Sequence, residues 1–152
     1  MTQTIAPKTA LYDRDYLQWI EDITTKLRAR DFNHLDIENL IEEIEDLGKS
    51  EKKELLNRLV ILLEHLLKRL YVNMSQEFSG WERTIREQRR QIKRSIKFSP
   101  SLAPLFYQFF DDALDDALDE VRKEKGYKPV QFPDTWHFSR DIDAILNIDF
   151  WE

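Results

Sequence analysis

The sequence predicts an all-α protein, a compact bundle of five to six helices with an ordered C-terminal loop that contains aromatic and proline residues. Apolar residues recur at helical spacing through most of the 152 residues. The chain has only 3 Gly and 5 Pro, and 34% of its residues are charged, which is typical of helical domains. The alternation of polar and apolar residues that marks a strand is absent. These three observations together indicate a helical bundle.

The first three helices are predicted over residues 13–30, 36–48 and 50–74. Asp36 suits the N-cap of the second helix, and Gly48 suits its C-terminal end. The third helix is apolar almost all round, so we expect it to lie at the centre of the bundle.

The later helices have their own start signals. Ser79 and Glu82 have the spacing of a capping box, which predicts the start of a basic helix. Ser99 and Pro100 predict the N-cap and first position of the next helix. These signals give helices over residues 79–98, 99–125 and 139–147, with a loop over residues 127–138.

The length fits one domain, so we expect a flexible N-terminal tail over residues 1–10 and a single helical domain over residues 11–152. Cysteine is absent, which excludes disulfides, thiolate metal ligands and cysteine nucleophiles. No apolar run reaches the roughly 18 residues of a membrane span. The N-terminus also lacks the apolar segment of a secretory signal. A cytoplasmic protein without a membrane partner is therefore expected.

Several blocks of the chain are distinctive: LYDRDYLQW, LDIENLIEEIEDLGKSEKKEL, LLEHLLKRLY, GWERTIREQR, KFSPSL and the closing FPDTWHFSRDIDAILNIDFW. Together they resemble the bacterial family called domain of unknown function 29, which is common in cyanobacteria. The chain departs from the family at Arg69-Leu70-Tyr71, where a Trp is usual, and at Thr135-Trp136, in place of a Cys-Pro pair. The resemblance implies an all-helical fold and no particular activity.

The basic segment, residues 79–98, sorts its residues by helical angle. It holds seven cations against Glu82 and Glu87, hence +5, in a chain whose formal net charge is -6. Trp81, Ile85 and Ile92 share a narrow apolar stripe on the other side of the helix. The candidate binding face for an anion or a partner comprises Arg83, Arg86, Arg90, Lys93, Arg94 and Lys97.

Two acidic blocks complement this face. Residues 36–46 and residues 111–120 each carry six carboxylates and no cation. Packing of basic against acidic helices, within the fold or across a dimer, would explain all three blocks. The leading hypothesis is therefore a non-enzymatic interaction module that associates with itself or with another protein. The alternative is that the basic face binds nucleic acid or another anion, although the acidic total and the lack of interleaved aromatics disfavour it.

A third hypothesis is a metal-assisted hydrolase that uses Glu42, Glu45 and His65. It requires the second and third predicted helices to be antiparallel, so that a carboxylate reaches His65. A core or boundary histidine is the simpler interpretation of His65. Because a pair of His65 with Glu42 or Glu45 has neither a nucleophile nor a third ligand, the sequence defines no reaction, no cofactor and no metal site.

Overall fold

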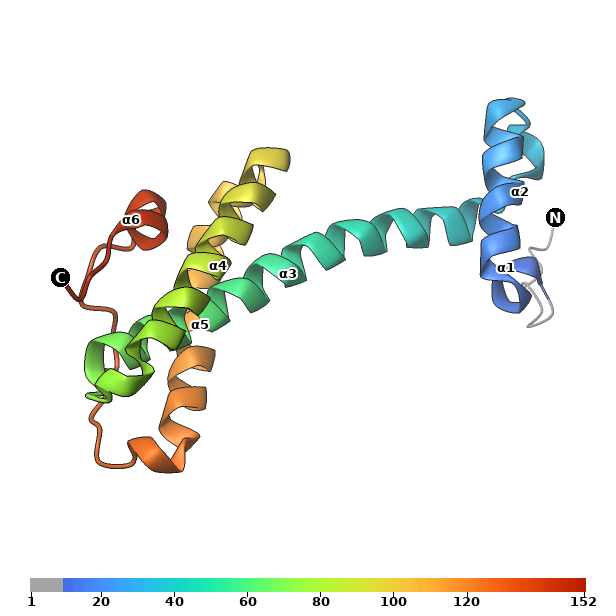
Figure 1. Ribbon diagram of the computed structural model, residues 1–152. Helices are drawn as coiled ribbons and strands as arrows, with labels where there is room; N and C mark the ends of the chain where they lie inside the picture. The colour runs from blue at the N-terminus through green and yellow to red at the C-terminus, as the bar shows by residue number, and fades with distance from the viewer. Residues whose placement is uncertain (1–9) are drawn as a thin grey trace. The chain divides into compact units, whose positions relative to one another are not determined.

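The computed structural model describes residues 10–152, which are 77% helical and contain no strand. This confirms the predicted all-α class. The helices, including three short 3-10 helices named η, follow one another in the order shown in Figure 1: α1 (Leu11–Arg14), α2 (Tyr16–Arg28), η1 (Phe32–His34), α3 (Ile37–Tyr71), η2 (Ser75–Glu77), α4 (Phe78–Phe98), α5 (Leu102–Lys123), η3 (Lys125–Tyr127) and α6 (Ile142–Asn147).

The chain divides into two compact units, with the boundary between Lys49 and Ser50. The first unit contains α1, α2, η1 and the start of α3, and the second unit contains the remainder. The single domain predicted over residues 11–152 stays a prediction, since one helix runs through the boundary. The predicted flexible tail lies outside the described residues, apart from Ala10.

Helix α3 corrects the prediction of two helices over residues 36–48 and 50–74. It is one uninterrupted helix of 35 residues (Figure 1). A glycine that ends a helix usually adopts a left-handed conformation, and none of the described glycines has a positive φ. A glycine inside a helix costs about 1 kcal/mol relative to alanine, which favourable neighbours such as Leu47 and Lys49 can offset.

Replacing Gly48 by alanine is therefore expected to stabilise the protein by about 0.5–1 kcal/mol. A Cβ at this position would meet no heavy atom within 4 Å, so only the gain in helix propensity remains. Thermal unfolding followed by circular dichroism measures the change, with the exposed Lys49→Ala as a control expected to be nearly neutral. Destabilisation by Gly48→Ala would instead indicate a left-handed helix end at this position.

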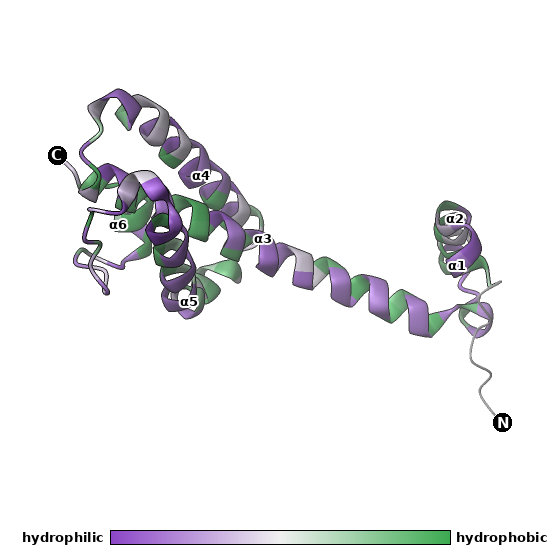
Figure 2. Ribbon diagram, turned by 90° about the horizontal axis from the view of Figure 1, so that it is seen from below, coloured by the Kyte–Doolittle hydropathy of each residue, from purple (hydrophilic) through white to green (hydrophobic). Residues whose placement is uncertain are grey.

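The core of the second unit is centred on the later half of α3. This confirms the predicted central position of residues 50–74. Helices α4, α5 and α6 contribute apolar side chains to the same core. Figure 2 shows hydrophobic and hydrophilic positions alternating along the ribbons of these helices. The fully buried residues include Leu59, Leu62, Leu63, Leu66, Ile85, Ile92, Phe106 and Ile145.

Three predicted helix starts are displaced in the structure. Helix α4 begins at Phe78 without a side-chain cap, so the prediction of a capping box at Ser79 and Glu82 is wrong. Helix α5 begins at Leu102 rather than at Pro100, because residues 99–102 form a turn in which Leu102 N–H donates to the Ser99 carbonyl at 2.9 Å. The last helix starts at Ile142, three residues later than predicted.

The C-terminal loop is ordered, as the sequence predicts. Phe132 and Trp136 are buried within it. The Trp136 ring contacts Phe110 of α5 and Phe150 near the chain end, with ring centroids 6.1 and 5.6 Å apart. Aromatic contacts of this kind fix the loop against α5 and position α6 beside α4.

Candidate functional site

The six cations predicted as a binding face lie together on the outer side of α4, and we call them the basic face. All six, Arg83, Arg86, Arg90, Lys93, Arg94 and Lys97, are exposed. The opposite side of the helix is buried, with Trp81 at 7% exposure and Ile85 and Ile92 at 0%. The buried apolar stripe therefore turns the cations outward, as the helical spacing predicts.

Most of the basic face has no electrostatic partner within residues 10–152. Only Arg90 forms an ion pair, to Glu87 one turn away at 2.8 Å, and both groups are exposed. The other five cations make no ion pair or side-chain hydrogen bond in the described chain. In particular, none contacts a carboxylate of α5. Of the two arrangements that the sequence leaves open, pairing of α4 with the acidic block of α5 inside one chain is not formed among the described residues, because the cations face away from the core that the two helices share.

Helix α5 carries an exposed carboxylate stripe. Of its six acidic residues, Asp111 pairs with Arg140 at 2.7 Å and Glu120 lies 3.7 Å from Lys123. The other four form no ion pair among the described residues and share one narrow side of the helix by their spacing. We call them the acidic face of α5: Asp112, Asp115, Asp116 and Asp119.

Arg89 is not part of the basic face, although the charge count includes it. Its side chain is 6% exposed and holds the C-terminal segment against α4. It donates to the Ile145 carbonyl at 2.9 Å, to Asp149 at 2.8 Å and to the Ile148 carbonyl. Burial lowers the pKa of the Arg89 guanidinium, and the hydrogen bond to Asp149 opposes this shift. In the sequence, this burial is indicated by the position of Arg89 one turn after Ile85, on the edge of the apolar stripe.

Two cavities follow one another along the basic face and share Lys93. The first, about 270 Å³, lies between α4 and the end of α6. The second, about 520 Å³, includes Phe98, whose side chain is 81% exposed at the end of α4. Sequence reasoning missed Phe98 as a surface feature. The lining residues are Arg86, Arg89, Arg90, Lys93, Leu146 and Asn147 for the first cavity, and Lys93, Arg94, Lys97 and Phe98 for the second.

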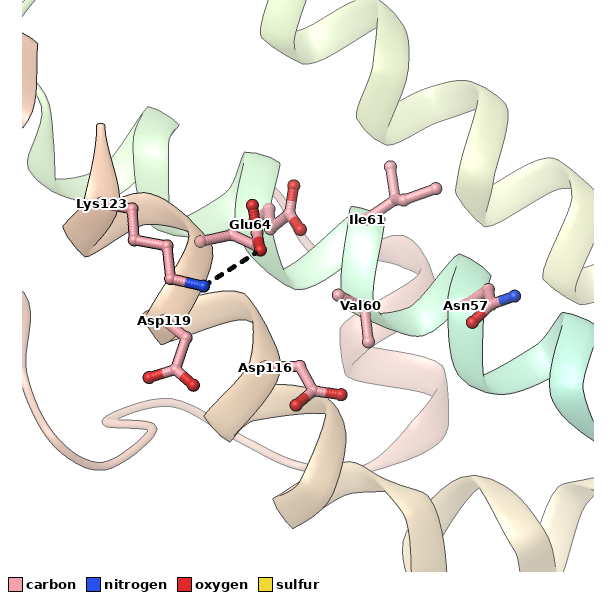
Figure 3. Close-up of a pocket in the computed structure, with 8 residues that line it drawn as sticks. Asn57, Val60, Ile61, Glu64, Asp116, Asp119 and Lys123 are labelled. Atoms are coloured by element: carbon pink, nitrogen blue, oxygen red, sulfur yellow. Dashed lines mark ion pairs between the residues drawn. The ribbon is translucent and has the colours of Figure 1, made fainter. Parts of the chain in front are cut away.

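A third cavity, about 560 Å³, lies between α3 and α5 and is bordered by carboxylates (Figure 3). Val60 and Ile61 supply its apolar part, and Asp116 and Asp119 of the acidic face line the other side. Burial raises the pKa of the Glu64 carboxyl, and the nearby Lys68 opposes the shift. The acidic face of α5 therefore borders a surface that is hollowed and partly apolar.

The structure does not bring Glu42, Glu45 and His65 together through a helical hairpin. All three belong to α3, which has no turn that could fold its first part back on His65. His65 Nδ1 instead contacts the Ile61 carbonyl of the preceding turn at 2.8 Å, and burial lowers its pKa. Within residues 10–152, no group of three or more histidines and carboxylates could hold a metal ion. The helical hairpin that the metal-hydrolase hypothesis requires is therefore not formed within α3.

The comparisons with known proteins give one positive finding. No curated protein and no solved structure matches the chain. None of the helices in the described part of the chain is long and apolar enough to cross a membrane. A family model described as "Domain of unknown function DUF29" matches residues 11–151, so the chain belongs to this family, as its sequence blocks indicate.

Proposed function

We propose that the protein is a non-enzymatic helical interaction module that associates with a second copy through the basic face of α4 and the acidic face of α5. One observation carries the proposal. The second unit exposes two faces of opposite charge, and five cations and four carboxylates on them have no ion-pair partner among residues 10–152. Complementary potentials of this kind select partners and accelerate encounter.

The expected association is weak and salt-sensitive. An exposed ion pair contributes about 0–1 kcal/mol, so several pairs must form together to hold two copies. Salt screens such pairs strongly, because the Debye length falls from about 10 Å at 0.1 M to about 3 Å at 1 M. The hollowed, partly apolar surface beside Asp116 and Asp119 would add contact area that salt does not weaken.

Reversing either face should abolish this association, and combining the two reversed proteins should restore it. One variant replaces Arg83, Arg86, Lys93 and Lys97 by Glu, and the other replaces Asp112, Asp115, Asp116 and Asp119 by Lys. Each variant alone repels itself at the contact. In an equimolar mixture, both faces of one variant are acidic and both faces of the other are basic, so contacts between the two variants are complementary. Size-exclusion chromatography with light scattering at about 50 mM and about 500 mM salt reports the masses.

The matched control reverses four exposed lysines outside both faces, Lys49, Lys52, Lys125 and Lys128, to Glu. It changes the net charge as much as the basic-face variant and is expected to keep the wild-type mass. A wild-type protein that is monomeric at both salt concentrations would overturn the proposal. So would a mixture of the two reversed variants that forms no complex.

Nucleic-acid binding is the second candidate for the basic face, and one observation favours it. Phe98 is exposed beside Lys93, Arg94 and Lys97, so an aromatic platform adjoins the cations. Base stacking on such a platform contributes about 1–3 kcal/mol per base. The same chromatography separates the candidates: a complex rich in 260 nm absorbance at low salt, which high salt removes, would assign the face to nucleic acid instead.

A further inference from the structure

The first unit has very little buried core. In the described residues 10–49, only Trp19 and Ile23 are buried. Polar contacts hold α1 and α2 to the start of α3: Trp19 Nε1 donates to Asp36 at 3.0 Å, and Tyr12 and Tyr16 each donate to Glu43 at 2.5 Å. The hydrogen bonds from Tyr12 and Tyr16 lower the pKa of the Glu43 carboxyl. This contact therefore fixes α1 and α2 to the start of α3 through Asp36 and Glu43.

Apolar stripes extend from this contact along both helices. On α2, Ile20 and Leu27 lie at helical spacing on either side of the buried Ile23 and are 37% and 38% exposed. On α3, Ile41, Ile44 and Leu47 are 46%, 60% and 69% exposed. We call these five residues the unit-1 apolar face: Ile20, Leu27, Ile41, Ile44 and Leu47.

An exposed apolar surface of this kind indicates that a partner buries it. Monomeric proteins rarely expose contiguous apolar patches larger than a few hundred Å². A segment of about 40 residues is also at the lower limit for a fold that is stable without external support. The partly exposed aliphatic side chains supply part of the roughly 800 Å² that each partner contributes to a standard interface.

The charged residues beside the unit-1 apolar face indicate which partner binds to it. The α3 stripe is bordered by the exposed carboxylates Glu38, Glu42 and Glu45, whereas α2 ends in the exposed Arg28 and is followed by Arg30. Neither arginine forms an ion pair among the described residues. If two copies of the unit meet face to face, α2 of one lies on α3 of the other, and these arginines meet the carboxylates. We propose that the unit-1 apolar face is a homodimer contact that completes a four-helix core with a second copy.

This contact goes beyond the proposed function and does not depend on it, because it uses the other unit of the chain. The two associations respond to salt in opposite ways. Ion pairs between the basic and acidic faces weaken as salt rises. An apolar contact persists at high salt, since it depends on removal of apolar surface from water.

The test is the mass of the protein at about 500 mM salt, where the ionic association is screened. We expect a dimer for the wild type and at least about a tenfold weaker dimer for the double variant Ile44→Gln and Leu47→Gln. Both side chains are more than half exposed, so the variant should keep its helix content in circular dichroism. The control is Ile148→Gln, the same change at an exposed isoleucine of the second unit, which should remain dimeric.

Each outcome decides a different point. A wild-type monomer at 500 mM salt across the concentration range would overturn the apolar contact, even if the protein associates at 50 mM salt. A double variant that remains as dimeric as the wild type would also overturn it. A dimer that survives high salt in the variants with reversed charged faces, and dissociates only in the double glutamine variant, would establish the contact. Masses of the reversed variants that equal the wild-type mass at about 50 mM salt as well would refute the ionic contact.

Discussion

Replacing Arg89 by alanine is expected to lower the free energy of unfolding by about 3–5 kcal/mol. The guanidinium is buried and satisfies two backbone carbonyls, those of Ile145 and Ile148, together with the carboxylate of Asp149. Its removal leaves the carbonyl of the buried Ile145 and the part-buried carbonyl of Ile148 without the guanidinium donor, and it releases the C-terminal segment from α4. A lysine at position 89 should rescue only part of the loss, since one ammonium cannot reproduce the three directed donors.

Urea unfolding, with the midpoint and the slope determined separately, measures this loss. The neighbouring Arg90→Ala is the matched control, because Arg90 is exposed and pairs only with Glu87 in the described chain. Its expected effect is within about 0.5 kcal/mol. Equal effects of the two substitutions would show that Arg89 does not hold the C-terminal segment. A smaller slope for Arg89→Ala alone would instead indicate that the segment has already detached in the native state.

Replacing Phe106 by alanine is also expected to have a large effect and to lower the free energy of unfolding by about 3–5 kcal/mol. Phe106 is fully buried on α5, and its ring contacts Phe110 with centroids 6.3 Å apart. The substitution removes the apolar area from the core and leaves a cavity that the surrounding helices fill only in part. The protein should therefore unfold at a much lower temperature while its helical fold is retained.

The same substitution at Phe98 is the control for Phe106→Ala. Phe98 is 81% exposed, so its truncation should change the free energy of unfolding by less than about 0.5 kcal/mol. Thermal unfolding of the two variants in parallel compares one residue type at two degrees of burial. A comparable loss for both would mean that Phe98 is covered in solution, for instance by a partner on the basic face.

Local signals in the sequence account for most helices and for the direction of their faces. The apolar stripe of α4 determines which side enters the core, and its six outward cations follow from that stripe alone. The leucine-rich half of α3 is central because leucines cover most of its surface. Helix ends are less well predicted, since Ser79, Ser99 and Gly48 each match a terminal signal that the structure does not use at that position.

The failure at Gly48 has a physical cause. A terminal glycine is recognised by its left-handed conformation, which composition does not reveal, and a helix can pass through glycine at a cost of about 1 kcal/mol. The metal hypothesis for Glu42, Glu45 and His65 depended on that helix end. When the helix continues, the hairpin that would unite them is lost.

The sequence by itself determined the helical class, the outward basic face and the central helix, because each depends on periodicity or local composition. Its distinctive blocks indicated the family through their resemblance to it. Only the tertiary structure decided the role of Arg89, the exposure of Phe98 and the lack of ion pairs between α4 and α5 within the described chain. These features depend on which segments distant in sequence meet. A charge count gives seven equivalent cations, and the fold turns one of them inward to bind the C-terminal backbone.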